Sequence, residues 1–349
     1  MPDLSALAGF AIGLAFGGLG LLTGFCLLSG LRDWWNDNDG RKLRSFALAL
    51  AVAIAGTQAL AVTGTVEIGK SLYLQPTFSA PLIFVGGLLF GLGMVLSNGC
   101  AARALVLLGK GNLRSLVVIA LIGITAQMTL KGLLGPARLA FMQWTQVSPD
   151  AVSVPALLSM LGLSDLAARV LATGAISGGL AIFAFSDATF RRSLSAVIAG
   201  LGVGALVVAG WAATGWFAVD EFNPIPVTSL TFVAPLSDSL QYVMLSTGLS
   251  LSFGVAVVFG VLAGSFTIAL LTGRFQLEGY TSAPHMLRSV SGAMLMGIGG
   301  AMAYGCSVGQ GLTGLSTLAL PSFVAAAGIL SGAAIGLRGR AVVPALAAR

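Results

Sequence analysis

The chain has 349 residues, of which 56% are hydrophobic and only 9% are charged, and its mean hydropathy is +0.96. This composition excludes an ordinary soluble domain, because one aqueous globule could not bury so much apolar surface. It predicts an all-α polytopic membrane protein. The formal charge of +6 does not indicate a nucleic-acid partner, because Lys and Arg form short clusters between apolar runs, as they do beside membrane spans.

An apolar run predicts a membrane crossing where it reaches the length of about 20 residues that a helix needs to span the hydrocarbon core. They predict nine crossings, at residues 5–31, 43–64, 80–109, 115–135, 166–186, 194–218, 236–272, 284–315 and 321–337. The run 236–272 is long enough for a tilted or broken extension. Residues 136–163 contain three prolines and are predicted to form an interfacial hairpin.

Basic residues accumulate in alternate connections, as the positive-inside rule requires. With the N-terminus outside and the C-terminus inside, the inner connections hold Arg32, Arg41, Lys42, Arg44, Lys110, Arg114, Arg191, Arg192, Arg274, Arg288, Arg338, Arg340 and Arg349. The outer connections hold chiefly Lys70, Lys131 and Arg138, with the acidic Glu67, Asp220 and Glu221. The rule therefore predicts this orientation.

An internal repeat is indicated by five identities at a constant offset of 206 residues. The matched pairs are Gly86 and Gly292, Gly91 and Gly297, Gly93 and Gly299, Gly99 and Gly305, and Cys100 and Cys306. We expect a first repeat at 1–135, an interfacial hairpin and linking crossing at 136–193, and a second repeat at 194–349. The odd number of crossings between equivalent elements predicts that the two copies have opposite orientations in the membrane.

Each repeat contains a crossing that is interrupted by polar residues. A break within the hydrocarbon is tolerated only where protein or a polar pathway satisfies the backbone. Two related breaks should therefore meet near the midplane and present half-helix N-termini to a small anionic solute. The candidate residues are Cys100, Cys306, Ser97, Asn98, Gly99, Arg103, Gly305, Ser307 and Gln310. Neither break contains a carboxylate, which disfavours a cation or proton site.

Two of these assignments stay open from the residues alone. Arg103 could neutralise an anion, or it could point toward the inner surface with Lys110. Cys26 could be a small buried hydrophobe or part of the site, and its removal should have the milder effect if it stands at an entrance. The three cysteines are too dispersed for a disulfide framework, and with a single His they suggest no metal site.

The broken segments also resemble a known family. The segments GLGMVLSNGCAARALVLLGKGN and GIGGAMAYGCSVGQGLTGLSTLALPS, together with the early Cys26, resemble the YeeE/YedE family of bacterial inner-membrane sulfur transporters. The likeness covers nearly the whole chain. It implies an hourglass-like fold, uptake of thiosulfate, and transient hydrogen bonding of the substrate by Cys100, Cys306 and Cys26. It also implies a cytoplasmic TusA-like sulfur carrier as a partner.

Three classes of function remain at this point. The favoured one is a transporter that takes up thiosulfate or a related small sulfur anion. The second is a membrane sulfurtransferase that forms a cysteine persulfide and hands the sulfur to a cytoplasmic carrier, which requires a thiolate beside a cation or a helix N-terminus. The third is a structural subunit, which leaves the duplicated breaks without a purpose. For the favoured reading we expect no catalytic residue, metal or cofactor.

Overall fold

A computed structural model of the protein describes residues 4–217, 227–280 and 282–342, with side chains through residue 339 apart from that of residue 217. Among these residues there is no strand, and eight helices are long and apolar enough to cross a membrane. The prediction of an all-α polytopic membrane protein is confirmed. Asp220, Glu221 and Arg349, which the sequence placed on opposite sides, lie outside the described residues, as does the side chain of Arg340.

The helices before the predicted hairpin are α1 to α6. Their bounds are α1 Leu4–Thr23, α2 Leu27–Asp37, α3 Arg41–Val62, α4 Ala80–Leu96, α5 Ala101–Gly109 and α6 Leu113–Leu130. Two 3₁₀ turns, Ile68–Lys70 and Leu72–Leu74, lie between α3 and α4. The hairpin region forms two short helices, α7 (Gly135–Thr145) and α8 (Val154–Met160).

The remaining elements follow the hairpin. They are α9 Asp165–Phe185, α10 Ala188–Arg192, α11 Leu194–Phe217, α12 Val233–Leu245, α13 Phe253–Leu271, α14 Ala283–Met302, the π-helix Gly309–Gly314 and α15 Leu320–Val342. The predicted run 236–272 is thus a span, α13, with a broken extension, α12, which is one of the two alternatives expected from its length. Ser252 begins α13 by accepting a hydrogen bond from the Val255 N–H (3.4 Å).

The predicted first crossing, 5–31, is interrupted, which corrects the expectation of one continuous helix. α1 ends at Thr23, and Gly24 adopts a left-handed φ of 67° before α2 begins at Leu27. Glycine reaches this conformation without a Cβ clash, so the helix can end there without a polar residue. Together α1 and α2 still form one candidate span, Leu4–Asp37.

The predicted crossing 284–315 is not among the eight candidate spans of the described residues. Its long helix, α14, carries His285 and Arg288 in its first turns. α14 nevertheless lies in the middle of the protein, where it packs against α4 and α6. The crossing expected at 284–315 is therefore present as a helix, although it is less apolar than the eight candidate spans.

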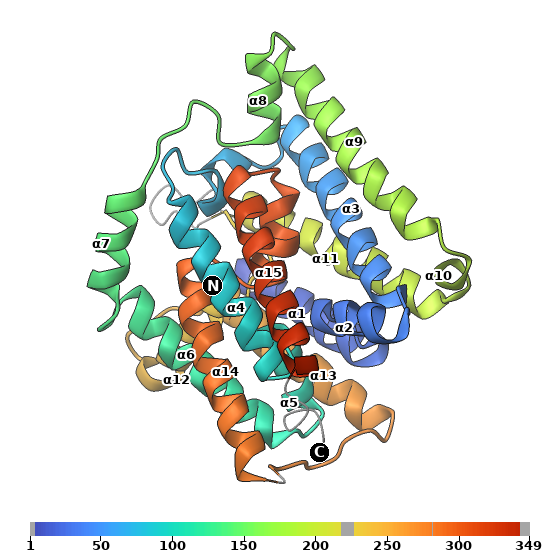
Figure 1. Ribbon diagram of the computed structural model, residues 1–349, viewed down its shortest axis with the longest axis vertical. Coiled ribbons are helices and arrows are strands. Elements are labelled where there is room, and N and C mark those ends of the chain that lie inside the picture. Colours follow the sequence, from blue (N-terminus) through green and yellow to red (C-terminus); the bar gives the residue numbers. More distant parts are fainter. Residues whose placement is uncertain (1–3, 218–226, 281, 343–349) are drawn as a thin grey trace.

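Close glycine contacts join α4 and α14 at the centre of the protein (Figure 1). A Cβ on Gly86 would lie 2.7 Å from the Gly299 carbonyl oxygen, and a Cβ on Gly93 would lie 2.5 Å from that of Gly292. The start of each helix thus contacts the end of the other, so the two run antiparallel. The contacts are also reciprocal, because Gly292 and Gly299 are the residues matched to Gly86 and Gly93 by the 206-residue offset.

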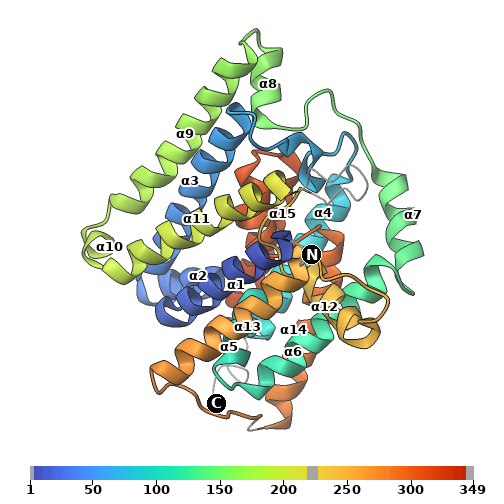
Figure 2. The same cartoon turned by 180° about the vertical axis from the view of Figure 1, so that it is seen from behind.

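The other helices surround this central pair. α1 packs on α13, α3 packs on α11, and α15 packs on α4. α9 runs along the outer side of α3 in both views of the ribbon (Figure 1, Figure 2). Most side chains of α9 face away from the rest of the protein, and Ala168, Ala172 and Ala184 are its buried residues.

Candidate functional site

Helices α4 and α14 end in the same backbone geometry. Asn98 and Tyr304 take left-handed φ angles of 58° and 56°. The next N–H, of Gly99 or Gly305, donates to the carbonyl five residues earlier, at 3.0 Å and 2.9 Å. This is the Schellman pattern, which satisfies the carbonyl groups at a helix end. The predicted equivalence of the two breaks therefore extends to their hydrogen bonds, and each break delivers a cysteine directly after the glycine.

The Cys26 segment forms a third break, in which the Gly24 N–H donates to the carbonyl four residues earlier, at Gly20 (3.0 Å). In all three breaks the cysteine stands two residues after a left-handed residue, which is Gly24 in this case. Cys26 is the N-cap residue of α2, and Cys100 is the N-cap residue of α5. Cys306 precedes the π-helix. Gly24, Phe25 and Cys26 continue an apolar run, so the third break was not predicted. The one signal for it in the sequence is the glycine two residues before the cysteine.

Two thiols meet in what we call the central cavity. Cys26 and Cys100 lie beside each other there, and Ser307 lies close to Cys100. These three residues line a cavity of about 10 Å³, together with Arg103 and Phe25. A space of this size holds about one water molecule. The cavity is therefore closed to any larger solute in this conformation.

Arg103 faces this cavity, which answers the question that the sequence left open. Its side chain lines the space beside Cys26 and Cys100. Among the described residues it forms no hydrogen bond and no ion pair. A guanidinium carries five N–H donors and a permanent charge. Arg103 thus places an unneutralised cation at the two thiols.

Cys306 lies deeper than the other two cysteines and is fully buried. Backbone N–H groups surround its sulfur: the Gly309 N–H donates to Sγ at 3.3 Å, and those of Val308 and Phe232 are also directed at it. Its neighbours in the chain line two different spaces: Ser307 lines the central cavity, and Tyr304 lines a second space around Tyr73. Cys306 therefore lies between the central cavity and the space around Tyr73.

That second space, which we call the Tyr73 cavity, has a volume of about 70 Å³. It is lined by Tyr73, Tyr304 and Gln310, among others. The Gln310 side chain donates from Nε2 to the Ala303 carbonyl (2.6 Å), while its Oε1 is buried without a described partner. Tyr73 was not among the predicted residues, because it belongs to the connection between α3 and α4 and has no counterpart in either break.

The remaining predicted residues hold the breaks in place and do not line these two cavities. Asn98 Oδ1 accepts a hydrogen bond from Arg32 Nη1 (3.0 Å), and Ser97 Oγ donates to the Ser289 carbonyl (3.3 Å). These bonds tie the first break to α2 and to α14. Gly99 and Gly305 were also predicted. Gly99 leaves room for the side chain of Arg103, and Gly305 leaves room for the side chain of Gln310.

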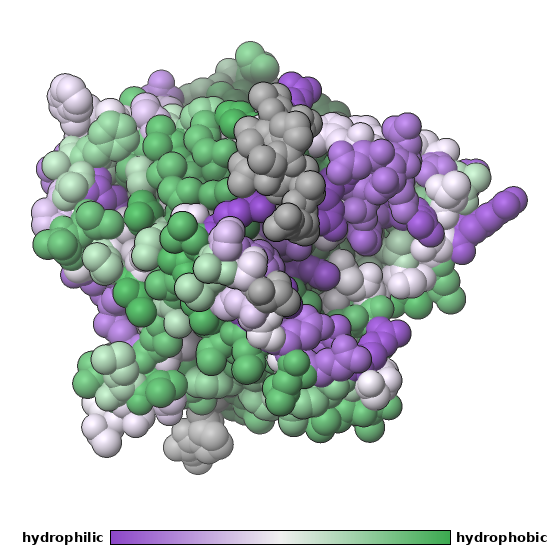
Figure 3. Space-filling model, turned by 60° about the horizontal axis from the view of Figure 1, so that its bottom comes forward, coloured by the Kyte–Doolittle hydropathy of each residue, from purple (hydrophilic) through white to green (hydrophobic). Residues whose placement is uncertain are grey.

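A third space, which we call the polar cavity, has a volume of about 200 Å³. The first turns of α3 and α11 line it, with Arg41, Lys42, Ser45 and Ser195, and so does Phe25. Figure 3 shows hydrophilic side chains gathered over the right of the face it presents, the side on which α2 and α10 lie in Figure 1. This end of the protein carries the basic connections that the positive-inside rule placed inside.

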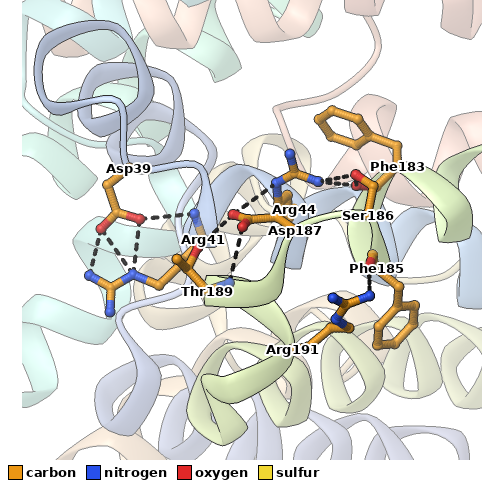
Figure 4. Close-up of polar contacts among 9 residues, drawn as sticks. All are labelled: Asp39, Arg41, Arg44, Phe183, Phe185, Ser186, Asp187, Thr189 and Arg191. Carbon is orange, nitrogen blue, oxygen red and sulfur yellow. Dashed lines mark hydrogen bonds and ion pairs between the residues drawn. The ribbon is translucent and has the colours of Figure 1, made fainter.

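Ion pairs organise the wall of the polar cavity (Figure 4). Arg41 binds Asp39 through both carboxylate oxygens and lowers the pKa of that carboxyl to about 2, so both groups are charged at neutral pH. Arg44 donates to Ser186 Oγ (2.7 Å) and to the Phe183 carbonyl, and it forms an ion pair with Asp187 (3.6 Å). Arg44 thereby joins α3 to the corner between α9 and α10.

Within the described chain, no group of three or more His, Cys, Asp and Glu residues could hold a metal ion. The three cysteines are free thiols. The chemistry that the site offers consists of thiols, hydroxyls and backbone N–H groups with one cation. This set suits weak, successive contacts with an anion.

Comparison with known proteins places the chain among sulfur transporters. A thiosulfate transporter TsuA of Escherichia coli (strain K12) is 25% identical over 307 residues, which cover 82% of this chain and 81% of the relative. A second thiosulfate transporter TsuA, of Spirochaeta thermophila, is 27% identical over 347 residues, covering 91% and 93%. Residues 22–335 match the family described as sulphur transport. Because that match spans all three breaks, the chain belongs to the sulphur transport (YeeE/YedE) family.

Proposed function

We propose that this protein takes up thiosulfate, or a closely related small sulfur anion, into the bacterial cytoplasm through a pathway lined by its three cysteines. The names of the two relatives support the substrate. The observation that carries the pathway is the placement of three buried cysteines. Cys26 and Cys100 line the central cavity, and Cys306 lies in the chain between residues that line the Tyr73 cavity and the central cavity. The cysteines thereby connect the two cavities.

The solute enters at the Tyr73 cavity and passes Cys306, then Cys100 and Cys26. A thiol is a weak, polarizable donor, so each contact with the anion is short-lived, as passage through several sites requires. Backbone N–H groups at Cys306 and the guanidinium of Arg103 offset the loss of hydration along the way. Because the central cavity holds about one water, passage requires it to widen.

The orientation of the pathway follows from the charges. The polar cavity carries Arg41 and Lys42 and opens to the cytoplasm, whereas the Tyr73 cavity faces the periplasm. The N-terminus is then periplasmic and the C-terminus cytoplasmic, in the bacterial inner membrane. A TusA-like carrier would receive sulfur on the cytoplasmic side.

The two repeats, 1–135 and 194–349, form an inverted-topology pair joined by the hairpin and linking crossing at 136–193. The reciprocal glycine contacts between α4 and α14 support this arrangement, because a two-fold axis between the helices produces this pattern. The matching Schellman ends at Asn98 and Tyr304 support it as well. The cysteines of both repeats then meet at the middle of the membrane.

The alternative is a membrane sulfurtransferase, and one observation favours it: the Arg103 cation lies beside two thiols. A Cys100 or Cys26 thiolate would attack the outer sulfur of thiosulfate and displace sulfite, leaving a persulfide on the protein. Mass spectrometry after exposure to thiosulfate separates the two functions. A persulfide supports the enzyme, whereas three unmodified thiols support passage.

The test of the transporter is uptake of labelled thiosulfate by purified protein in proteoliposomes, with sulfate and sulfite as competitors. We expect saturable uptake in which neither competitor replaces thiosulfate, and loss of uptake in the Cys100→Ala and Cys306→Ala variants. Wild-type uptake by both variants would show that these two cysteines do not take part in the pathway. Equal competition by sulfate would show that the terminal sulfur of thiosulfate is not recognised.

A further inference from the structure

The side chain of Phe25 separates two spaces. It lines the central cavity together with Cys26 and Cys100, and it also lines the polar cavity together with Arg41 and Lys42. The first space has a volume of about 10 Å³, and the second has a volume of about 200 Å³. A single aromatic ring therefore stands where the narrow part of the interior meets the wide, polar part.

The ring is held by a second aromatic side chain. Phe25 stacks on Phe46, with 5.5 Å between the ring centroids and 16° between the ring planes. Phe46 is buried on α3, and its ring approaches Gly311 of the π-helix. Because Phe46 belongs to the regular helix α3, its backbone forms the fixed half of the pair, and its ring borders the central cavity and an apolar space of about 240 Å³.

Phe25 has more freedom than its partner. It stands in the first break, between Gly24 (φ 67°) and the extended Cys26 (φ −166°), and belongs to no helix. Its side chain is partly exposed. A change of rotamer at Phe25 would therefore join the two cavities without unfolding a helical turn, whereas the same movement of Phe46 would disrupt packing on α3.

We propose that Phe25 is the inner gate of the pathway: its ring, stacked on Phe46, closes the cysteine-lined cavity against the polar cavity and swings aside to release the sulfur anion. The role as an exit rests on the proposed function. An apolar constriction stops water and ions by dewetting, and the polar cavity beyond it supplies hydroxyls and cations that rehydrate the anion. Phe25 thereby limits the leakage of water and ions through the pathway, and it sets the size of the solute that is released.

The first test does not depend on transport. Cys26 is kept as the single cysteine in a Cys100→Ser, Cys306→Ser background, and its modification by a negatively charged, membrane-impermeant methanethiosulfonate is timed from each side of the membrane. We expect reaction chiefly from the side of the polar cavity. Phe25→Ala should accelerate it about tenfold, the factor set by losing one aromatic pair, and Phe25→Trp should slow it.

Phe266→Ala is the matched control. Phe266 also belongs to an aromatic pair, with Phe275, but it is 44% exposed on α13 and lines none of the three cavities. Its removal should leave the reaction rate of Cys26 unchanged. The proposal is overturned if Phe25→Ala and Phe266→Ala give the same rate, or if Cys26 reacts faster from the side of the Tyr73 cavity.

A second measurement tests the proposed gate at Phe25 separately from the proposed transport of thiosulfate. In the protein with all three cysteines, we expect the wild type to exclude sulfate and Phe25→Ala to admit it while thiosulfate uptake continues. Retained exclusion of sulfate, with correct insertion of the variant, would contradict the gate. Accelerated modification of Cys26 in a protein that never transports thiosulfate would support the gate and reject the proposed function.

Discussion

The thiols of Cys26 and Cys100 lie side by side at the N-termini of α2 and α5, two short helices that belong to different crossings. Each helix begins after a break in an apolar run, and each break ends in a cysteine. The pair forms the wall of the central cavity opposite Ser307. In the proposed pathway, Cys26 is therefore expected to act at the core and not at the entrance.

Cys26→Ala should therefore reduce thiosulfate uptake as severely as Cys100→Ala. A hydrogen bond to a charged group contributes about 1.5–3 kcal/mol, so losing either thiol should lower the initial rate by about tenfold or more. Cys26→Ser, which retains a donor of similar size, should keep part of the activity. The measurement is the initial rate of thiosulfate uptake in proteoliposomes. A clearly milder effect of Cys26→Ala would show that Cys26 acts only at the periphery of the pathway.

Mild oxidation should join Cys26 to Cys100 and leave Cys306 free. Adjacent thiols form a disulfide when their backbones can reach the geometry it needs, whereas the sulfur of Cys306 is enclosed by backbone N–H groups. Peptide mapping of protein treated with copper phenanthroline tests this. Uptake should be lost on oxidation and restored by a reductant, and a Cys26→Ser variant should not respond. A linked peptide that contains Cys306 would contradict the arrangement of the thiols.

The central glycines should be intolerant of even a methyl group. In Gly93→Ala the new Cβ would lie 2.5 Å from the Gly292 carbonyl oxygen, so α4 and α14 must separate. Overpacking of this kind costs about 1–3 kcal/mol, and the thermal midpoint of the protein in detergent should fall. Gly174→Ala is the control, because nothing lies within 4 Å of a Cβ at that position on α9. Equal midpoints for the two variants would contradict the close packing of α4 and α14.

Much of the fold could be predicted from the sequence because hydropathy and charge report directly on membrane crossing. The break at Cys100 was visible since Ser97 and Asn98 interrupt an apolar run, and the break at Cys306 was visible through its 206-residue match. The break at Gly24 was hidden, because its residues are as apolar as the helices around it. There the backbone conformation of one glycine, and not polarity, ends the helix.

The composition of the site was harder to predict than its position. Tyr73 reaches the neighbourhood of Cys306 from a connection between helices, and Phe25 reaches two cavities from a break that was not recognised. Both are contacts between elements distant in the sequence, which periodicity does not report. Ser97 and Asn98 were predicted as candidate contacts, but their side chains bond to α14 and α2. The polar residues of a break therefore show where the helix is interrupted. They do not show which side chains line the cavities.

Arg103 provides the sharpest test of electrostatics in the pathway. Its guanidinium lines the cavity of the two thiols and has no carboxylate partner among the described residues, so its charge is available to a passing anion. Arg103→Gln should lower kcat/KM for thiosulfate by about tenfold or more, the effect of one charged hydrogen bond. Arg103→Lys should retain part of the activity, because the charge is kept and the planar fork is lost.

The matched control for this charge is Arg114→Gln. Arg114 donates to the Gly279 carbonyl on the basic side of the protein and lines none of the three cavities. Removing it should leave uptake near the wild-type rate. If both arginine variants transport equally well, the cation beside the cysteines is not used for passage. If instead Arg103→Gln abolishes a persulfide on Cys26 or Cys100, its role is to stabilise a thiolate, and sulfur transfer replaces passage as the function of the central cavity.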